Sequence, residues 1–118
     1  MTDPYLYHYL AVVTRIVDGD TIVADISLGL HTWIHGERLR LARINTPELH
    51  GDNRLAGIAA RDFLGGMVLG KEVYIKTIKD TKERYGRYLA EIIIEHDGST
   101  VNVNDALILA GHAILVEY

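Results

Sequence analysis

The chain contains no cysteine among its 118 residues. This absence excludes disulfide bonds, thiolate zinc sites and a thiol nucleophile. Long hydrophobic runs are also missing, and none approaches the roughly 20 apolar residues that a membrane-spanning helix needs. The first residues do not combine a basic segment with a long apolar core, so no secretory signal is visible. We therefore predict a cytoplasmic protein without membrane contact.

Positive charge is in the minority, with 12 Lys and Arg against 16 Asp and Glu and a formal net charge of -4. A passive coat protein for nucleic acid would be basic, so the net charge argues against that class. The distribution is uneven, because residues 38–87 carry 11 basic and 6 acidic side chains, whereas the remainder carries 1 and 10. An acidic protein with a basic middle can still bind a polyanion on one face.

The length and the hydrophobic content of 48% are typical of one globular domain, residues 1–118. Alternating apolar residues and β-branched runs predict strands over residues 10–17, 21–28, 37–44, 71–78 and 87–95, with a short partner around residues 101–103. Apolar residues at helical spacing predict a helix over about residues 54–68, and Asn104 and Gly111 bound a second helix over about residues 105–110. Five strands with a helix after the third predict a β-rich α+β fold, a five-stranded OB-fold barrel with two packed helices.

The connections between these elements carry their own expectations. Residues 29–36 read as an irregular connection, residues 79–86 as a charged loop, and the apolar tail from residue 113 as a segment that packs back. Side chains of Asp52 or Asn53 are expected to cap the first helix, and that of Asn104 the second.

Two carboxylates, Asp18 and Asp20, flank a glycine at the turn between the first two predicted strands. Carboxylates at a turn supply the hard oxygen ligands that Ca²⁺ and Mg²⁺ prefer. The same Asp-Gly pair is also ordinary hairpin chemistry, so this segment alone leaves both interpretations open.

A cation and a carboxylate follow the third predicted strand within one short span. Arg40 precedes Asn45-Thr46-Pro47-Glu48 by five residues, and Pro47 stiffens the loop that carries Glu48. Phosphodiester hydrolysis needs a group that orients or deprotonates water and a fork of donors for the phosphoryl oxygens. Taken by itself, the span is more typical of a surface ion pair.

A third polar cluster, Glu83-Arg84-Tyr85-Gly86-Arg87, comes just before the last long strand. Arginine is preferred where bidentate contact with phosphate is needed, and tyrosine can stack on a base or contact a phosphate. A solvated charged turn is the alternative interpretation of this cluster.

The order of these motifs is more specific than any one of them. Asp-Gly-Asp-Thr after one strand, Arg-x₄-Asn-Thr-Pro-Glu after the third and Tyr-Gly-Arg before the fifth resemble the staphylococcal nuclease (thermonuclease) family over about residues 10–116. The resemblance implies an OB-fold barrel and a Ca²⁺-dependent phosphodiesterase that cleaves DNA and RNA. It further implies that the 5′-oxygen leaves and that 3′-phosphate ends form.

Residue roles follow from the same resemblance. Metal ligands would be Asp20, Asn45 and the backbone carbonyl of Thr46. The implied catalytic residues are Glu48, acting on the attacking water, and Arg40 and Arg87, clamping the phosphate, while Arg84 and Tyr85 would contact the bound nucleotide.

The sequence departs from the family pattern at several points. Family members usually have Asp where this chain has Asn45, so one negative charge is lost and either Ca²⁺ binds more weakly or another divalent cation is preferred. Arg84 stands where a lysine often precedes the tyrosine. The connection at residues 29–36 is long, and no third helix follows near the end of the sequence.

Three functional hypotheses remain at this point. The first is a metal-dependent nuclease, favoured because Arg40, Glu48 and Arg87 occur together. The second is a nuclease-like module that binds nucleic acid or protein without cleaving, favoured by Asn45. The third is an OB-fold partner of another protein. The oligomeric state and the preference for DNA or RNA are not encoded in any of these motifs.

Overall fold

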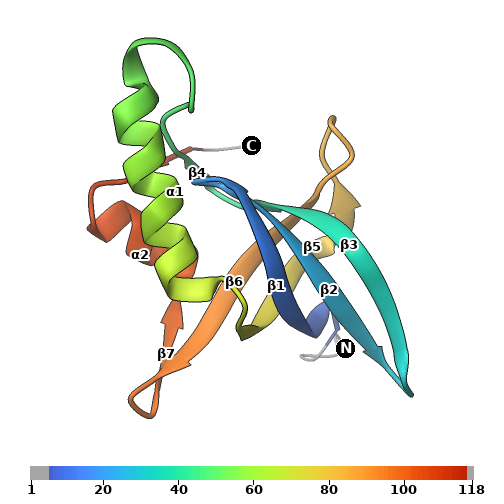
Figure 1. Cartoon of the computed structure of the whole chain (residues 1–118). Coiled ribbons are helices and arrows are strands. Elements are labelled where there is room, and N and C mark those ends of the chain that lie inside the picture. Colours follow the sequence, from blue (N-terminus) through green and yellow to red (C-terminus); the bar gives the residue numbers. More distant parts are fainter. Residues whose placement is uncertain (1–5, 117–118) are drawn as a thin grey trace.

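Within residues 6–116 the chain forms eight strands, two α-helices and one 3₁₀ turn (Figure 1). The structure is a computed structural model and describes residues 6–116. In chain order the elements are β1 (His8–Asp18), β2 (Thr21–Gly29), β3 (Thr32–Leu41), β4 (Ile44–Asn45), η1 (Gly51–Asn53), α1 (Arg54–Val68), β5 (Glu72–Lys82), β6 (Tyr88–His96), β7 (Ser99–Asn102), α2 (Val103–Leu109) and β8 (Ile114–Leu115).

Five of the strands close into a ring of hydrogen bonds. The sheet runs β3-β2-β1-β5-β6-β7, and β3 also pairs with β6 in parallel, with Leu39 opposite Tyr88 and Leu41 opposite Ala90. Closure removes the exposed edges that an open sheet would present. The predicted five-stranded OB-fold barrel with two helices is therefore confirmed, and β4 and β8 add a small separate ladder.

The core fills the barrel and continues beneath the helices. Inward side chains alternate along each strand, as Ile22 and Ala24 do on β2, and α1 adds Leu64 and Val68. Both helices lie against the same side of the barrel in Figure 1, and α1 packs on β1. In residues 6–116 no helix is both long and apolar enough to cross a membrane.

The prediction of an irregular connection at residues 29–36 was wrong. β2 extends to Gly29 and β3 begins at Thr32, so only Leu30 and His31 form the turn, both with positive φ (54° and 63°). Such two-residue turns match the twist of paired strands, although Gly or Asn usually fills them. Since neither residue here is Gly or Asn, the turn left no signal in the sequence. The resulting β2–β3 hairpin projects from the barrel at the lower right of Figure 1.

The strand expected over residues 37–44 breaks in two. β3 ends at Leu41, and Arg43 adopts a positive φ of 69° before β4 resumes at Ile44. Likewise, the loop expected over residues 79–86 is shorter than predicted, because β5 continues to Lys82. The tail does pack back over the described residues, since β8 pairs with β4, while residues 117–118 lie outside the described range.

The expected helix caps are corrected as well. Neither Asp52 nor Asn53 caps α1 through its side chain. At α2 the cap is Asn102, whose side chain accepts a hydrogen bond from Asp105 N, and Asn104 is instead fully buried. The Asn104 amide donates to the carbonyls of Ala42 and Ala90 and accepts from Ile92 N. It therefore ties the end of β3 to β6 at the point where the barrel closes.

Two glycines allow the site loops to approach α1 closely. A Cβ at Gly57 of α1 would clash with the backbone carbonyl of Glu48, and a Cβ at Gly19 would lie 2.7 Å from Thr46 Oγ1 and 2.8 Å from Ala60 Cβ. Both loops thus rest on α1 at positions where only a small residue fits. The placement of Glu48 depends on this contact.

We predict that Gly57→Ala lowers the free energy of unfolding by about 1–3 kcal/mol, because the added methyl group overpacks a close backbone contact. Urea denaturation measures the change. Gly66→Ala is the matched control, since a Cβ at this α1 position meets no atom within 4 Å. The control should gain about 0.5–1 kcal/mol from the better helix propensity. Equal behaviour of the two variants would contradict the close contact.

Candidate active site

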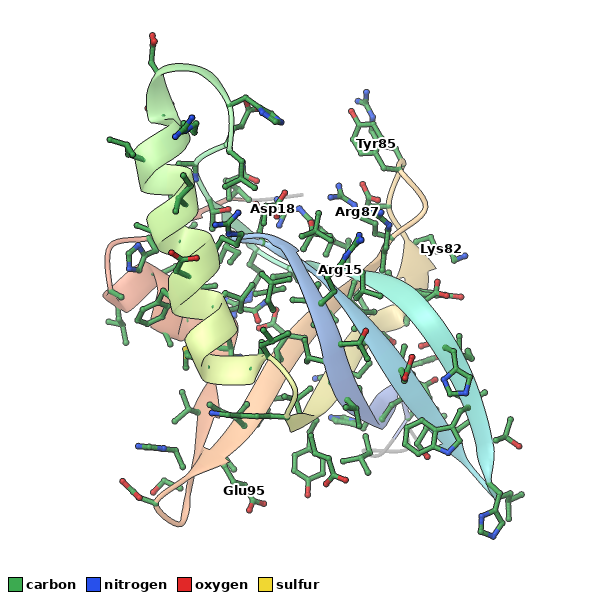
Figure 2. All side chains as sticks on the ribbon, viewed as in Figure 1. Arg15, Asp18, Lys82, Tyr85, Arg87 and Glu95 are labelled. Carbon is green, nitrogen blue, oxygen red and sulfur yellow. The ribbon has the colours of Figure 1, made fainter. Side chains whose placement is uncertain are left out.

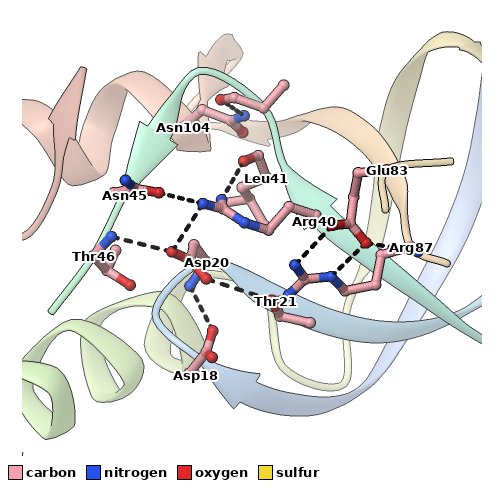
Figure 3. Close-up of polar contacts among 11 residues, drawn as sticks. Asp18, Asp20, Thr21, Arg40, Leu41, Asn45, Thr46, Glu83, Arg87 and Asn104 are labelled. Atoms are coloured by element: carbon pink, nitrogen blue, oxygen red, sulfur yellow. Dashed lines mark hydrogen bonds and ion pairs between the residues drawn. The ribbon is translucent and has the colours of Figure 1, made fainter. Parts of the chain in front are cut away.

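The Asp20 carboxylate of the β1–β2 turn meets the guanidinium of Arg40 at the end of β3 (Figure 3). Arg40 is only 8% exposed, and its Nη2 lies 3.4 Å from Asp20 Oδ2. The same carboxylate oxygen accepts a hydrogen bond from Thr46 N at 3.1 Å. Asp20 therefore joins the turn, the end of β3 and the loop after β4.

Two further contacts orient the Arg40 guanidinium. Nη1 donates to the Leu41 carbonyl at 2.7 Å, and Nη2 donates to Asn45 Oδ1 at 2.5 Å. A guanidinium only donates, so the amide of Asn45 must present its oxygen here. That oxygen already has a cationic partner, which an incoming metal ion would have to share or displace.

The second proposed clamp, Arg87, is held by Glu83 of the β5–β6 turn. Nε and Nη2 of Arg87 donate to the two Glu83 oxygens at 2.9 and 3.1 Å, and Nη1 donates to the Thr21 hydroxyl at 2.9 Å. These three bonds leave one N–H on each terminal nitrogen available to another acceptor. Two available donors on one guanidinium can contact oxygens of a phosphate.

The two guanidiniums converge because their partners are neighbours in sequence. Arg40 pairs with Asp20 and Arg87 donates to Thr21, so both arginines reach the point where the β1–β2 turn enters β2 (Figure 3). They arrive there from β3 and from the residue before β6, strands that pair in parallel. Arginines from two different elements that reach neighbouring residues can together bind one anion with several oxygens.

Negative charge is crowded on the other side of the turn. Asp18 is half-buried and accepts a hydrogen bond from Asp20 N. Burial, with the neighbouring Asp20 carboxylate, raises the pKa of Asp18 to about 6. By contrast, the hydrogen bonds from Arg87 lower the pKa of Glu83 to about 2. A cation near the turn would relieve the repulsion between the two aspartates.

Glu48 stands apart from this network. It lies in the loop between β4 and η1, its side chain is exposed, and among residues 6–116 it makes no hydrogen bond or ion pair. Arg84 and Tyr85 occupy the tip of the β5–β6 turn, where Tyr85 is 69% exposed. The guanidiniums of Arg84 and Arg87 lie 4.9 and 5.4 Å from the Tyr85 ring centre. The structure thus joins Arg40, Asp20, Asn45 and Thr46 directly, and Tyr85 to Arg87.

The donors available to a metal are all oxygens. They are the carboxylate of Asp20, the amide oxygen of Asn45 and the backbone carbonyl of Thr46, with Asp18 beside them. Within the described part of the chain no three His, Asp or Glu side chains form a group that could hold a metal ion. Oxygen donors with few charges suit a hard divalent cation that completes its shell with water and phosphate oxygens.

Two positioning groups were missed in the sequence. Glu83 belongs to a cluster singled out for its arginines, yet its own contact with Arg87 needed the turn geometry. Thr21 was noted only as part of Asp-Gly-Asp-Thr, and its hydroxyl proves to be a partner of Arg87. A glutamate four residues before an arginine was the available signal for the first contact; nothing local indicated the second.

Comparison with known proteins identifies the family of the chain. Residues 38–118 match the family described as staphylococcal nuclease homologue. The chain belongs to this family, as the order of its motifs indicated. The matched range includes both arginines and Glu48, whereas the Asp18–Thr21 turn precedes it.

Three relatives illustrate the range of the family. The chain is 29% identical to an uncharacterized protein of Methanocaldococcus jannaschii over 90% of its own length and 58% of that protein. It is 31% identical to Endonuclease YhcR of Bacillus subtilis over 89% of the chain and 9% of that protein. Its identity to the Thermonuclease of Staphylococcus intermedius is 32%, over 68% of the chain and 46% of the enzyme. The chain thus spans just over half of the first relative and less than half of the other two.

The Glu83–Arg87 pair should give the stability a specific pH dependence. Because the pKa of Glu83 falls from 4.5 to about 2 on folding, its contribution is fully present above pH 4.5 and is lost as the pH falls towards 2. Glu83→Gln should therefore lower the free energy of unfolding by on the order of 2 kcal/mol at pH 7. Urea denaturation from pH 7 to pH 2 measures the difference, which should shrink at the acid end.

Glu72→Gln is the matched control, because Glu72 is an exposed glutamate of β5. Its substitution should change the stability little at any of these pH values. A wild-type advantage over Glu83→Gln that stays constant down to pH 2 would show that the carboxylate charge is not what Arg87 recognises.

Proposed function

We propose that the protein is a Ca²⁺-dependent nuclease that hydrolyses phosphodiester bonds of DNA and RNA. The observation that carries the proposal is the convergence of Arg40 and Arg87 on consecutive residues of one turn, Asp20 and Thr21. Family membership supports it, as do the printed names of two relatives, an endonuclease and a thermonuclease.

The arginines bind and polarise the scissile phosphate in this proposal. The two available N–H groups of Arg87 donate to phosphoryl oxygens, while Glu83 and Thr21 hold the guanidinium in orientation. Arg40, fixed by the Leu41 carbonyl, supplies a second positive charge close by. Negative charge grows on these oxygens in the transition state, so fixed donors lower the barrier without reorganising.

Glu48 acts on the attacking water. Its exposed carboxylate has no partner among the described residues and is free to accept a proton or orient the water. The water oxygen forms a bond to phosphorus as the bond to the 5′-oxygen breaks, and the leaving oxygen takes up a proton. The products are a 3′-phosphate and a 5′-hydroxyl end. A cation held by Asp20, Asn45 and Thr46 supplies charge neutralisation and positioning when bound.

A second candidate is a module that binds nucleic acid but cleaves it slowly. The contact between Arg40 and Asn45 favours it, because the amide lacks a charge and its oxygen is engaged. The retained Arg40, Glu48 and Arg87 favour the nuclease instead.

Cleavage of single-stranded DNA by the purified protein tests the proposal directly. We expect cleavage with Ca²⁺ and none with a chelator, and Glu48→Gln and Arg87→Ala should each reduce the rate by about 10²–10³-fold or more. Arg61→Ala is the arginine control, since Arg61 lies on α1 with only Asp62 as its ion-pair partner. Absence of Ca²⁺-dependent cleavage, or equal rates for wild type and Glu48→Gln, would refute the nuclease and leave the binding module.

The role of Asn45 is tested by Asn45→Asp. The added carboxylate raises the charge of the oxygen donor set, so Ca²⁺ should bind about tenfold more tightly. Calorimetric titration with Ca²⁺ measures the affinity without reference to activity. Asn102→Asp is the control, because Asn102 caps α2 and contacts Glu91 rather than Asp20. Unchanged affinity of Asn45→Asp would remove Asn45 from the metal site.

A further inference from the structure

The proposed chemistry uses only one end of the β2–β3 hairpin. Towards its tip, β3 carries Trp33 and His35, whose rings are stacked with centres 6.4 Å apart and an angle of 10° between their planes. Trp33 is 41% exposed, although tryptophan is usually shielded from water in a folded domain. A stacked and exposed aromatic pair offers a flat surface to a partner.

Strand register connects this pair to the arginine site. Thr21 lies opposite Arg40, while Val23 lies opposite Arg38 on β3 and Arg15 on β1. Because Ile22 and Leu39 point into the core, these neighbours point outward. Arg38 therefore lies next to Arg40 on the outer face of β3, on the side towards the hairpin tip. Arg15 lies on the same face of β1, two strands from Arg38. Figure 2 labels Arg15 and Arg87 towards the same end of the sheet.

A β-bulge brings the aromatic pair onto this same face. Trp33 and Arg38 are five residues apart, so a regular strand would place them on opposite faces. His35 and Gly36 together oppose Asp25, since Ile34 pairs with Ile26 and Glu37 with Ala24. Gly36 has a φ of 70°. The extra residue shifts the alternation of side chains by one position, so Trp33 and Arg38 lie on the same face. Bulges that redirect a side chain often occur next to functional sites.

We call the resulting surface the outer strip: Arg15, Arg38, His35 and Trp33. The side chains of Arg15 and Arg38 are exposed, and neither side chain makes a hydrogen bond or ion pair within residues 6–116. Asp25 also lies on this face, where it accepts a hydrogen bond from Gly36 N at 2.9 Å and lies 3.3 Å from His35 Nδ1. Two uncommitted guanidiniums beside an aromatic surface complement a polyanion whose bases carry flat faces.

We propose that the outer strip binds single-stranded nucleic acid and extends the substrate path from the arginine site to the hairpin tip. Arg38 and Arg15 contact phosphates, and a base stacks on Trp33. The proposal rests on the proposed function, because that function makes the arginine site the end of the path where cleavage occurs. At about 3.4 Å per residue, Arg40 and Trp33 are roughly 20–24 Å apart along β3, so a strand of several nucleotides is needed to span them.

The tryptophan itself reports on the proposal, because Trp33 is the only one in the chain. The Glu48→Gln variant in chelator, which cannot cleave, is titrated with single-stranded DNA of about 12 nucleotides, a length within OB-fold site sizes. Stacking of a base on the indole should quench its fluorescence. A dinucleotide should leave the fluorescence unchanged, since it does not span the strip.

Substitutions then separate stacking from charge. In fluorescence anisotropy with labelled DNA, Trp33→Ala should weaken binding by about tenfold or more. Arg38→Ala and Arg15→Ala should each reduce the slope of log affinity against log salt by about 0.7. Tyr74→Ala and Lys71→Ala are the controls, because both residues are exposed and lie on or next to β5, on the far side of β1 from the hairpin. Thermal unfolding verifies that each variant is folded.

Each outcome decides the proposal. DNA binding without quenching, no binding, or equal losses in the Tyr74→Ala control would overturn it. Fluorescence that changes with protein concentration alone, with a dimer in sedimentation, would assign the strip to contact between copies instead. Ca²⁺-dependent cleavage by the wild-type protein without quenching in the variant would leave the nuclease intact and reject the strip. Quenching without cleavage by the wild-type protein would keep the strip and reject the nuclease.

Discussion

The buried guanidinium of Arg40 is the interaction on which the site depends. A charge with so little exposure is tolerated only when it is paired and hydrogen-bonded. Arg40 meets this requirement through Asp20, the Leu41 carbonyl and Asn45, which belong to the β1–β2 turn, the end of β3 and β4. Satisfying one buried cation thus fixes three segments relative to each other. The same contacts place Thr21 where Arg87 can reach its hydroxyl.

Close packing on α1 completes the arrangement around this cation. Gly57 and Gly19 allow the Glu48 loop and the Asp18–Asp20 turn to lie against the helix at distances that a side chain would forbid. Asn104 secures the neighbouring closure of β3 onto β6 by pairing backbone groups that burial would otherwise leave unsatisfied. The geometry of this site therefore relies on residues that have no charged or reactive group themselves.

The parts of the fold that followed from sequence are those with a strong periodic signal. Alternation in β2 and helical spacing in α1 arise because one face of each element is buried. Every residue of the element contributes to that pattern, so the signal is strong. The turn at Leu30 and His31 and the break at Arg43 escaped prediction, because positive φ at non-glycine residues is imposed by the strands around them. Asn104 was predicted to be a helix cap because asparagine is common at that position. The structure instead buries its side chain, where it donates to the carbonyls of Ala42 and Ala90, residues far away in the sequence.

Sequence by itself determined the barrel, its two helices, the family and the identity of the charged residues near the site, since these follow from residue type and order along the chain. Only the tertiary structure decided that Glu83 orients Arg87, that Arg40 engages Asn45, and that a bulge at Gly36 puts Trp33 on the face of Arg38. The physical reason is that side-chain pairing depends on strand register and turn geometry. Both are settled by packing between segments far apart in sequence, as where β3 meets β6.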